Sequence, residues 1–114
     1  MRVKRGVASH KTHLKVRRQT KGMTRAHRSS LKRGRQATTR ALQYAYRDRR
    51  NKKRTFRALW NARINAAARA NGTTYSRFIA NLTKANIRLD RKVLAELSVK
   101  EPKAFEAILK SSDK

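Results

Sequence analysis

The stretch RALQYAYRDRRNKKRTFRALW, residues 40–60, combines the composition of a helix with a charge that no protein core can hold. Good helix formers dominate from Gln36 to Asn71, and neither proline nor glycine interrupts them. Between Tyr46 and Phe56 stand six basic residues, one acid and no apolar side chain. We therefore expect one helix over residues 36–71, about 54 Å long, whose middle packs on no protein core.

The charge of this middle segment indicates the kind of partner. Seven cations lie between Arg47 and Arg57, and Asp48 is the one acid among them. On a helix we expect these cations to cover every face, which indicates an anion that surrounds the helix. A DNA groove needs one cationic face, whereas a folded RNA with converging helices contacts all of them. The segment thus predicts a folded RNA as the partner.

Charge and hydrophobicity divide the chain into two regions. The net charge is +26 and the isoelectric point about 12.0, values typical of a protein that binds a polyanion. Residues 1–60 hold 21 lysines and arginines and one acid, whereas residues 61–114 hold 11 and five. Most large apolar residues lie in the second half. We expect a basic RNA-threading extension with the long helix over residues 1–57, and a small globular α-helical RNA-binding body over residues 58–114.

Apolar spacing predicts that the body is an all-α bundle of four helical pieces. The long helix should dock through a stripe at Phe56, Leu59, Trp60, Ile64 and Ala67. Thr73 or Thr74 should cap a second helix, and Asp90 a third. A final helix should begin near Pro102. The apolar residues expected to face inward from these later pieces are Tyr75, Phe78, Ile79, Leu82, Ala85, Ile87, Leu89, Val93, Leu94, Leu97, Phe105, Ile108 and Leu109.

The first 35 residues contain too few apolar side chains to fold without a partner, so we expect them to be disordered until RNA binds. Short helices are predicted at about residues 9–20 and 24–32. Ser9 and Thr24 are the expected N-caps, and Gly22 and Gly34 the expected ends.

Several stretches resemble the bacterial-type large-subunit ribosomal protein family called L-twenty. They are ALQYAYRDRRNKKRTFRALWNARINAAAR from residue 41, YSRFI from residue 75 and LDRKVLAELS from residue 89. VKRGV at residues 3–7 is similar to the family's start, whereas MTRAHRSSLKRGR at residues 23–35 departs from its usual pattern. The resemblance covers nearly the whole chain.

The resemblance implies a structural protein that binds large-subunit ribosomal RNA directly and promotes early assembly of the large subunit. It implies neighbouring large-subunit ribosomal proteins as further partners, and a place in the cytoplasmic ribosome or in that of an organelle. Some members also bind their own messenger RNA and repress its translation. The candidate RNA-binding residues are Arg2, Lys4, Arg5, Lys11, Lys15, Arg17, Arg18, Lys21, Arg25, Arg28, Arg40, Arg47, Arg49, Arg50, Lys52, Lys53, Arg54, Arg57, Arg63, Asn65, Arg69, Arg77, Arg88, Arg91 and Lys92.

The sequence contains no pattern typical of a metal site or of a catalytic site. The chain has no cysteine, and its three histidines lie in the basic arm without nearby acids, so neither a metal nor a cofactor is expected. Glu96 with Glu101 or Glu106 is the only carboxylate pair expected on the body, and no phosphate-binding loop accompanies it, so we expect no enzyme. For Trp60 core packing is favoured over base stacking. For Tyr44 and Tyr46 packing against RNA and simple exposure stay equally open.

Two rival classes remain. A DNA-compacting protein is equally basic but usually lacks a long helix joined to an apolar body. A membrane-active peptide segregates its charges onto one face, which RDRRNKKR does not do. No stretch is long and apolar enough for a secretory signal or a membrane span, so no membrane partner is expected.

Overall fold

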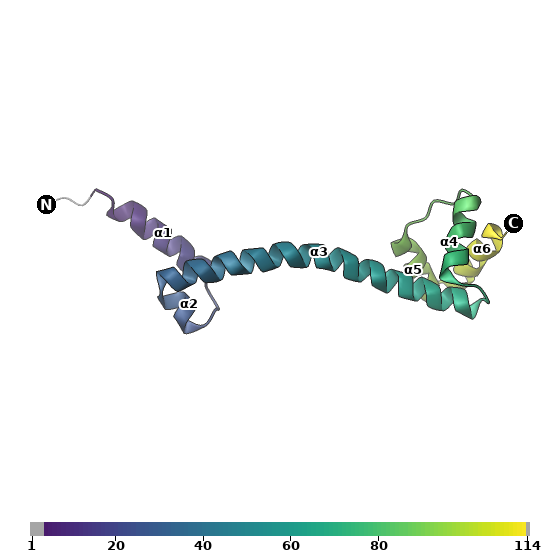
Figure 1. Ribbon diagram of the computed structural model, residues 1–114, viewed down its shortest axis with the longest axis horizontal. Helices are drawn as coiled ribbons and strands as arrows, with labels where there is room; N and C mark the ends of the chain where they lie inside the picture. The colour runs from purple at the N-terminus through teal and green to yellow at the C-terminus, as the bar shows by residue number, and fades with distance from the viewer. Residues whose placement is uncertain (1–3, 114) are drawn as a thin grey trace. The chain divides into compact units, whose positions relative to one another are not determined.

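The computed structural model describes residues 4–113 of the 114-residue chain, and every regular element in that range is an α-helix (Figure 1). The helices are α1 (Gly6–Gln19), α2 (Arg25–Ser29), α3 (Leu31–Ala70), α4 (Tyr75–Lys84), α5 (Arg91–Lys100) and α6 (Pro102–Ser112). The expected all-α class is confirmed. The chain divides into two compact units, one ending at Arg50 and the other beginning at Asn51. The functional division after residue 57 stays a prediction.

In the first unit, the end of α1 packs beside the start of α3 (Figure 1). Val16 and Thr20 are buried there, with 9% and 0% of their surface exposed. The Thr20 hydroxyl donates to the carbonyl oxygen of Val16 at 3.1 Å, so burial leaves no polar group without a partner. Gly22 follows at φ +85°, a left-handed conformation that suits glycine and turns the chain towards α2.

Gly34 was expected to end a helix, and this prediction is wrong because Gly34 lies inside α3. A Cβ atom at Gly34 would stand 2.8 Å from the carbonyl oxygen of His27 and 3.0 Å from Cγ1 of Val16. The glycine is therefore needed for close approach of α1 and α2 to α3, and not for a chain reversal. Because Gly34 does not end a helix, α3 continues through it and begins at Leu31, five residues before the predicted start at Gln36.

The two short helices differ from their predicted limits. The first begins at Gly6 with Arg5 in the N-cap position, so Ser9 is not its cap. The second ends at Ser29, before the predicted residue 32, and Thr24 precedes it as expected. The disorder expected for residues 1–35 in the absence of RNA stays a prediction.

The second unit contains the hydrophobic core of the body. Ile64 of α3 is fully buried, and Phe78, Leu94 and Phe105 each keep 1% of their surface exposed. The rings of Phe78 and Phe105 lie 5.1 Å apart, joining α4 to α6. The partly buried residues that pack against this cluster are Trp60, Ala67, Tyr75, Ile79, Ile87 and Ile108. Four helical segments therefore share one small core, as expected.

Turn chemistry positions these segments. After α3 ends at Ala70, Gly72 adopts φ +79° and the N–H of Thr73 donates to the carbonyl oxygen of Ala68 at 3.0 Å. Thr74 and Asp90 occupy the N-cap positions of α4 and α5 with extended backbone. Pro102 stands in the first turn of α6, where its missing N–H costs nothing. These predicted boundaries are confirmed to within one residue, but neither Thr74 nor Asp90 makes the side-chain hydrogen bond expected of a cap.

The predicted inward faces need five corrections. Ala85 is exposed, because α4 ends at Lys84 and Ala85 follows as its C-cap residue. Phe56 and Leu59 are 43% and 41% exposed, because the stripe that docks α3 runs through Ile64 and Ala68 instead. Val93 is 42% exposed, since α5 turns the neighbouring Leu94 and Ala95 into the core. Leu89, in the connection before α5, is 39% exposed. The surface of the second unit therefore carries exposed apolar side chains as well as cations.

Replacement of Gly34 by alanine tests the close packing of the first unit. Alanine favours a helix by about 1 kcal/mol over glycine, but its Cβ meets a backbone oxygen, and overpacking of this kind costs about 1 to 3 kcal/mol. We expect faster amide hydrogen exchange over residues 6–29 of the RNA-bound Gly34→Ala chain, with exchange in α4 to α6 unchanged. Gln36→Ala, at an exposed site in α3, is the control. Unaltered exchange in Gly34→Ala would contradict the packing described.

Candidate nucleic-acid interface

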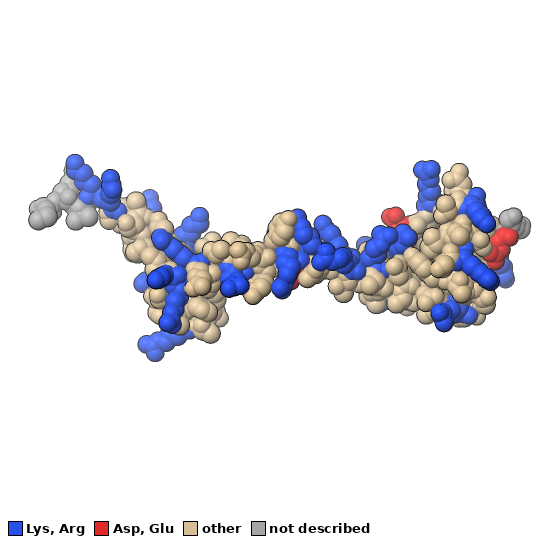
Figure 2. All heavy atoms as spheres, viewed as in Figure 1, with Lys and Arg blue, Asp and Glu red and all other residues tan. Residues whose placement is uncertain are grey.

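The surface carries many positive charges, and few of them are paired with acidic side chains of the protein. Of the 32 lysines and arginines, 30 lie in residues 4–113, and 29 of these are exposed (Figure 2). The exception is Arg91, which is half-buried. Two ion pairs form within the described range, Arg47 with Asp48 and Lys100 with Glu96. Most cations are therefore available to an external anion.

The predicted RNA-binding residues lie at the surface. All that the structure describes are exposed, apart from Asn65 and Arg91, which are half-buried. Arg2 lies outside the described residues. Their contacts with RNA stay a prediction.

Aromatic rings hold several cations of α3 in place. The guanidinium of Arg50 lies 3.5 Å from the ring centroid of Tyr46, and that of Arg47 lies 4.7 Å from the ring of Tyr44. Both tyrosines are exposed. Cation–π contacts at exposed sites contribute about 0.5 to 1 kcal/mol each, enough to limit the side-chain conformations of these arginines before any ligand binds.

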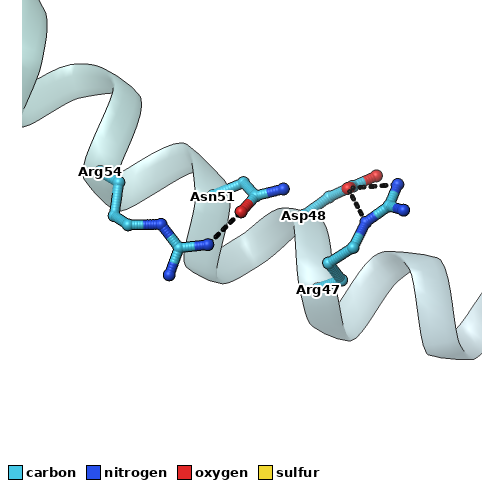
Figure 3. Close-up of polar contacts among 4 residues, drawn as sticks. All are labelled: Arg47, Asp48, Asn51 and Arg54. Carbon is cyan, nitrogen blue, oxygen red and sulfur yellow. Dashed lines mark hydrogen bonds and ion pairs between the residues drawn. The ribbon is translucent and has the colours of Figure 1, made fainter.

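The cations of residues 47–57 do not cover every face of α3, contrary to the expectation. At about 100° per residue, they leave about 140° of the helix circumference to Asp48, Asn51 and Thr55. Figure 3 shows how two neighbouring arginines lean towards this strip. Arg47 donates from Nε to Asp48 Oδ1 at 3.1 Å, and Arg54 donates to the amide oxygen of Asn51. An anion can therefore enclose most of this segment but not all of it.

On the first unit the structure groups two sets of predicted residues. Lys11, Lys15 and Arg18 line one shallow hollow on α1, at the spacing that places side chains on one helix face. Arg17 of α1 and Arg28 of α2 line a second hollow together. Each hollow therefore brings predicted cations of the first unit together.

On the second unit the structure brings Arg63 of α3 and Lys92 of α5 to the same hollow. Arg69, Arg77 and Arg88 lie in the last turn of α3, the first turn of α4 and the connection before α5. No hydrogen bond or ion pair within residues 4–113 joins these three to another predicted residue. They are exposed positions rather than one assembled site.

Arg91 has a structural contact that the sequence did not predict. Its Nε donates to the hydroxyl of Tyr75 at 2.9 Å, and this hydroxyl donates to the amide oxygen of Asn61 at 3.0 Å. The chain of hydrogen bonds connects α5, α4 and α3. Part of the Arg91 guanidinium thus serves the fold of the body.

The sequence prediction also omitted exposed cations at the start of α3, namely Lys32, Arg33 and Arg35. These three cations lie in the stretch MTRAHRSSLKRGR, where the chain departs from the family's usual pattern. The sequence KRGR carried the signal, since it has the same density of cations, three in four residues, as RDRR at residues 47–50.

Within the described range, no group of three or more His, Asp or Glu side chains is placed to hold a metal ion. Likewise, none of the helices described is long and apolar enough to cross a membrane.

One carboxylate on the body has a perturbed acidity. Glu96 accepts a hydrogen bond from Lys100 at 2.5 Å, and this bond and the charge of Lys100 lower the pKa of Glu96, with a smaller contribution from the charge of Lys92. The same pairing raises the pKa of Lys100. Because the pKa of Glu96 is lowered on folding, the small stabilisation it gives is present at neutral pH and is lost as the pH falls through its folded pKa.

Removal of Lys100 tests this pairing. In Lys100→Met the Glu96 carboxyl loses its strongest partner, so we expect its pKa to rise relative to the parent chain. Carboxyl NMR titration measures the change. Lys110→Met removes an exposed charge from α6 and serves as the control. An unchanged Glu96 midpoint in Lys100→Met would mean that the ion pair is not formed in solution.

The fold and the surface together define a class, namely all-α proteins that present many uncompensated cations on exposed helices. A family model described as "Ribosomal protein L20" matches residues 2–108. The chain is 55% identical over 111 residues to the large ribosomal subunit protein bL20 of Marinobacter nauticus, covering 97% of this chain and 95% of that protein. It is 53% identical over 111 residues to the bL20 protein of Methylorubrum populi, covering 97% and 92%.

A third relative, the large ribosomal subunit protein bL20 of Bartonella tribocorum, is 51% identical over 113 residues, with 99% of this chain and 85% of that protein covered. These matches extend over nearly the whole chain. The chain therefore belongs to the ribosomal protein L20 family, and the resemblance found in the sequence is confirmed.

Proposed function

We propose that this chain is a structural protein of the large ribosomal subunit that binds large-subunit ribosomal RNA directly and promotes early assembly of that subunit. The observation that carries the proposal is the exposure of 29 cations, nearly all without an acidic partner, in a member of this family. Neighbouring large-subunit ribosomal proteins are further partners under this proposal, and the chain works within the ribosome of the cytoplasm or of an organelle.

Electrostatics supports a polyanion as the partner. Binding of lysine and arginine to phosphates releases the counterions that surround RNA, and this release increases affinity with each contact. The helix α3 offers seven such cations between Arg47 and Arg57. They lie beyond the core residues of the body, so a partner that neutralises them costs the protein no packing.

We infer a division of labour within the chain. Residues 1–57 supply most of the charge and thread among RNA helices, whereas residues 58–114 recognise a shaped RNA surface. The support is that the hydrophobic core belongs to the second unit alone, which can hold its exposed side chains in fixed positions. The role is structural and not enzymatic. Binding to its own messenger RNA, which the family resemblance implied, stays a prediction that no contact described here favours.

A double substitution in α3 tests whether its cations bind phosphates. The slope of log affinity against log salt concentration should decrease in magnitude by roughly 0.7 to 0.9 for each phosphate that a variant no longer neutralises. For Arg50→Ala with Lys53→Ala we expect the slope for large-subunit ribosomal RNA to decrease in magnitude by roughly 1.4 to 1.8. Lys103→Ala with Lys110→Ala removes two exposed charges from α6 as the control. Equal slopes in both pairs would mean that Arg50 and Lys53 face solvent in the complex.

Competition between nucleic acids separates the proposal from the DNA-compacting alternative. At about 0.15 M salt, where screening acts over about 8 Å, we expect the full chain to prefer ribosomal RNA to a DNA duplex of equal length. Filter binding with labelled RNA and unlabelled competitors measures the preference. Equal or better competition by DNA would contradict the proposal.

A further inference from the structure

The body carries a hollow of about 200 Å³ between α3 and α5. Trp60 and Arg63 of α3 form one wall, and Lys92, Glu96 and Val99 of α5 form the other. The spacing of these three α5 residues places them on one face of the helix. Ala95 lies beneath them, 1% exposed, and its small side chain leaves the space between the two helices open.

Trp60 contributes an aromatic surface to this hollow. The indole is half-buried and packs against the hydrophobic core, which restricts its movement. The ring of Phe56 supports it at 6.2 Å between centroids. An aromatic ring held in this way can stack on a planar group without losing much conformational freedom.

The charges around the hollow favour an anionic group beside that planar group. Glu96 is paired with Lys100, which also lines the hollow, so these two charges largely cancel. Arg63 and Lys92 have no acidic partner within residues 4–113 and are both exposed. The hollow therefore combines an aromatic wall, an apolar floor and two available cations.

We propose that this hollow binds one unpaired nucleotide of an RNA, with the base against Trp60 and the phosphate between Arg63 and Lys92. This inference rests on the proposed function and names a specific binding mode for the body. A base within a duplex has its faces covered by its neighbours and cannot stack on a side chain unless it is flipped out. A run of acidic residues alone satisfies the cations but offers no aromatic ring for the indole, whereas every nucleotide of an RNA carries both a phosphate and a base, so RNA is the better match.

Trp60 is the only tryptophan, so its emission reports on this hollow in the full-length protein. The probe is a single-stranded oligoadenylate of about 12 nucleotides, within the range of small single-strand sites. We expect it to quench Trp60 emission. The same sequence in an RNA duplex, and two polyanions without bases, polyphosphate and polyglutamate, should bind with little quenching. Quenching of equal size by the duplex or by either polyanion would overturn the proposal.

Two charge-matched variants test the phosphate position. For Arg63→Ala with Lys92→Ala, we expect half-maximal quenching to need about tenfold more oligoadenylate or higher, because the phosphate then loses both cations that have no acidic partner within residues 4–113, and the remaining Lys100 is paired with Glu96. Lys103→Ala with Lys110→Ala removes the same charge from exposed sites elsewhere on the body, outside the candidate RNA-binding residues, and should cause a smaller shift. Equal shifts in the two variants would overturn the proposed site.

Fluorescence anisotropy of labelled oligoadenylate distinguishes failure of this site from failure of RNA binding itself. If anisotropy rises while Trp60 emission stays constant, RNA binds elsewhere and only the hollow is excluded. If anisotropy does not rise at about 0.15 M salt, the hollow does not bind single-stranded RNA and this inference fails, whereas the proposed function fails only if labelled ribosomal RNA is not retained in the filter-binding experiment described above.

Discussion

Repulsion between like charges is the constraint on which the rest of this structure depends. A net charge of +26 is distributed over helices that are mostly exposed, and two ion pairs within residues 4–113 offset little of it. Exposed pairs contribute at most about 1 kcal/mol, so they cannot hold such a chain together. The small core around Phe78, Leu94 and Phe105 stabilises the body alone. Beyond it, α3 depends on its own backbone hydrogen bonds and helix-forming residues, and the proposed polyanionic partner would relieve the repulsion among its cations.

The sequence predicts the helices of the body well because their signals are local. An uninterrupted run of helix formers indicates α3, and Gly72, Asp90 and Pro102 mark ends and starts through their own backbone preferences. The position of Gly34 was not predictable in this way. Its role depends on Val16 and the backbone of His27, which approach only in the folded first unit. Exposure of Phe56 likewise depends on which of two adjacent stripes of α3 meets the core.

The features of the candidate site also fall into those that follow from local sequence and those that depend on the folded structure. Exposure of the lysines and arginines follows from their cost of burial, and 29 of the 30 that the structure describes are exposed, whereas their contacts with RNA stay a prediction. Interactions between distant residues are different. The hydrogen bonds from Arg91 through Tyr75 to Asn61, and the hollow shared by Arg63 and Lys92, join residues far apart in the chain. They follow from the packing of α3, α4 and α5 and leave no periodic signal in the sequence.

The anchoring of α3 in the core has a consequence for how the long helix forms. Starting a helix is costly, with a nucleation factor of about 10⁻³, whereas adding residues to an existing helix is not. The last turns of α3 are held by burial of Ile64 and Ala68, so the body acts as a nucleus that is already in place. The helix can then extend backwards from the body, one residue at a time. Under the proposed function, phosphates would neutralise successive cations during this extension, so the helix and the RNA around it would become ordered together, starting from the C-terminal end of α3.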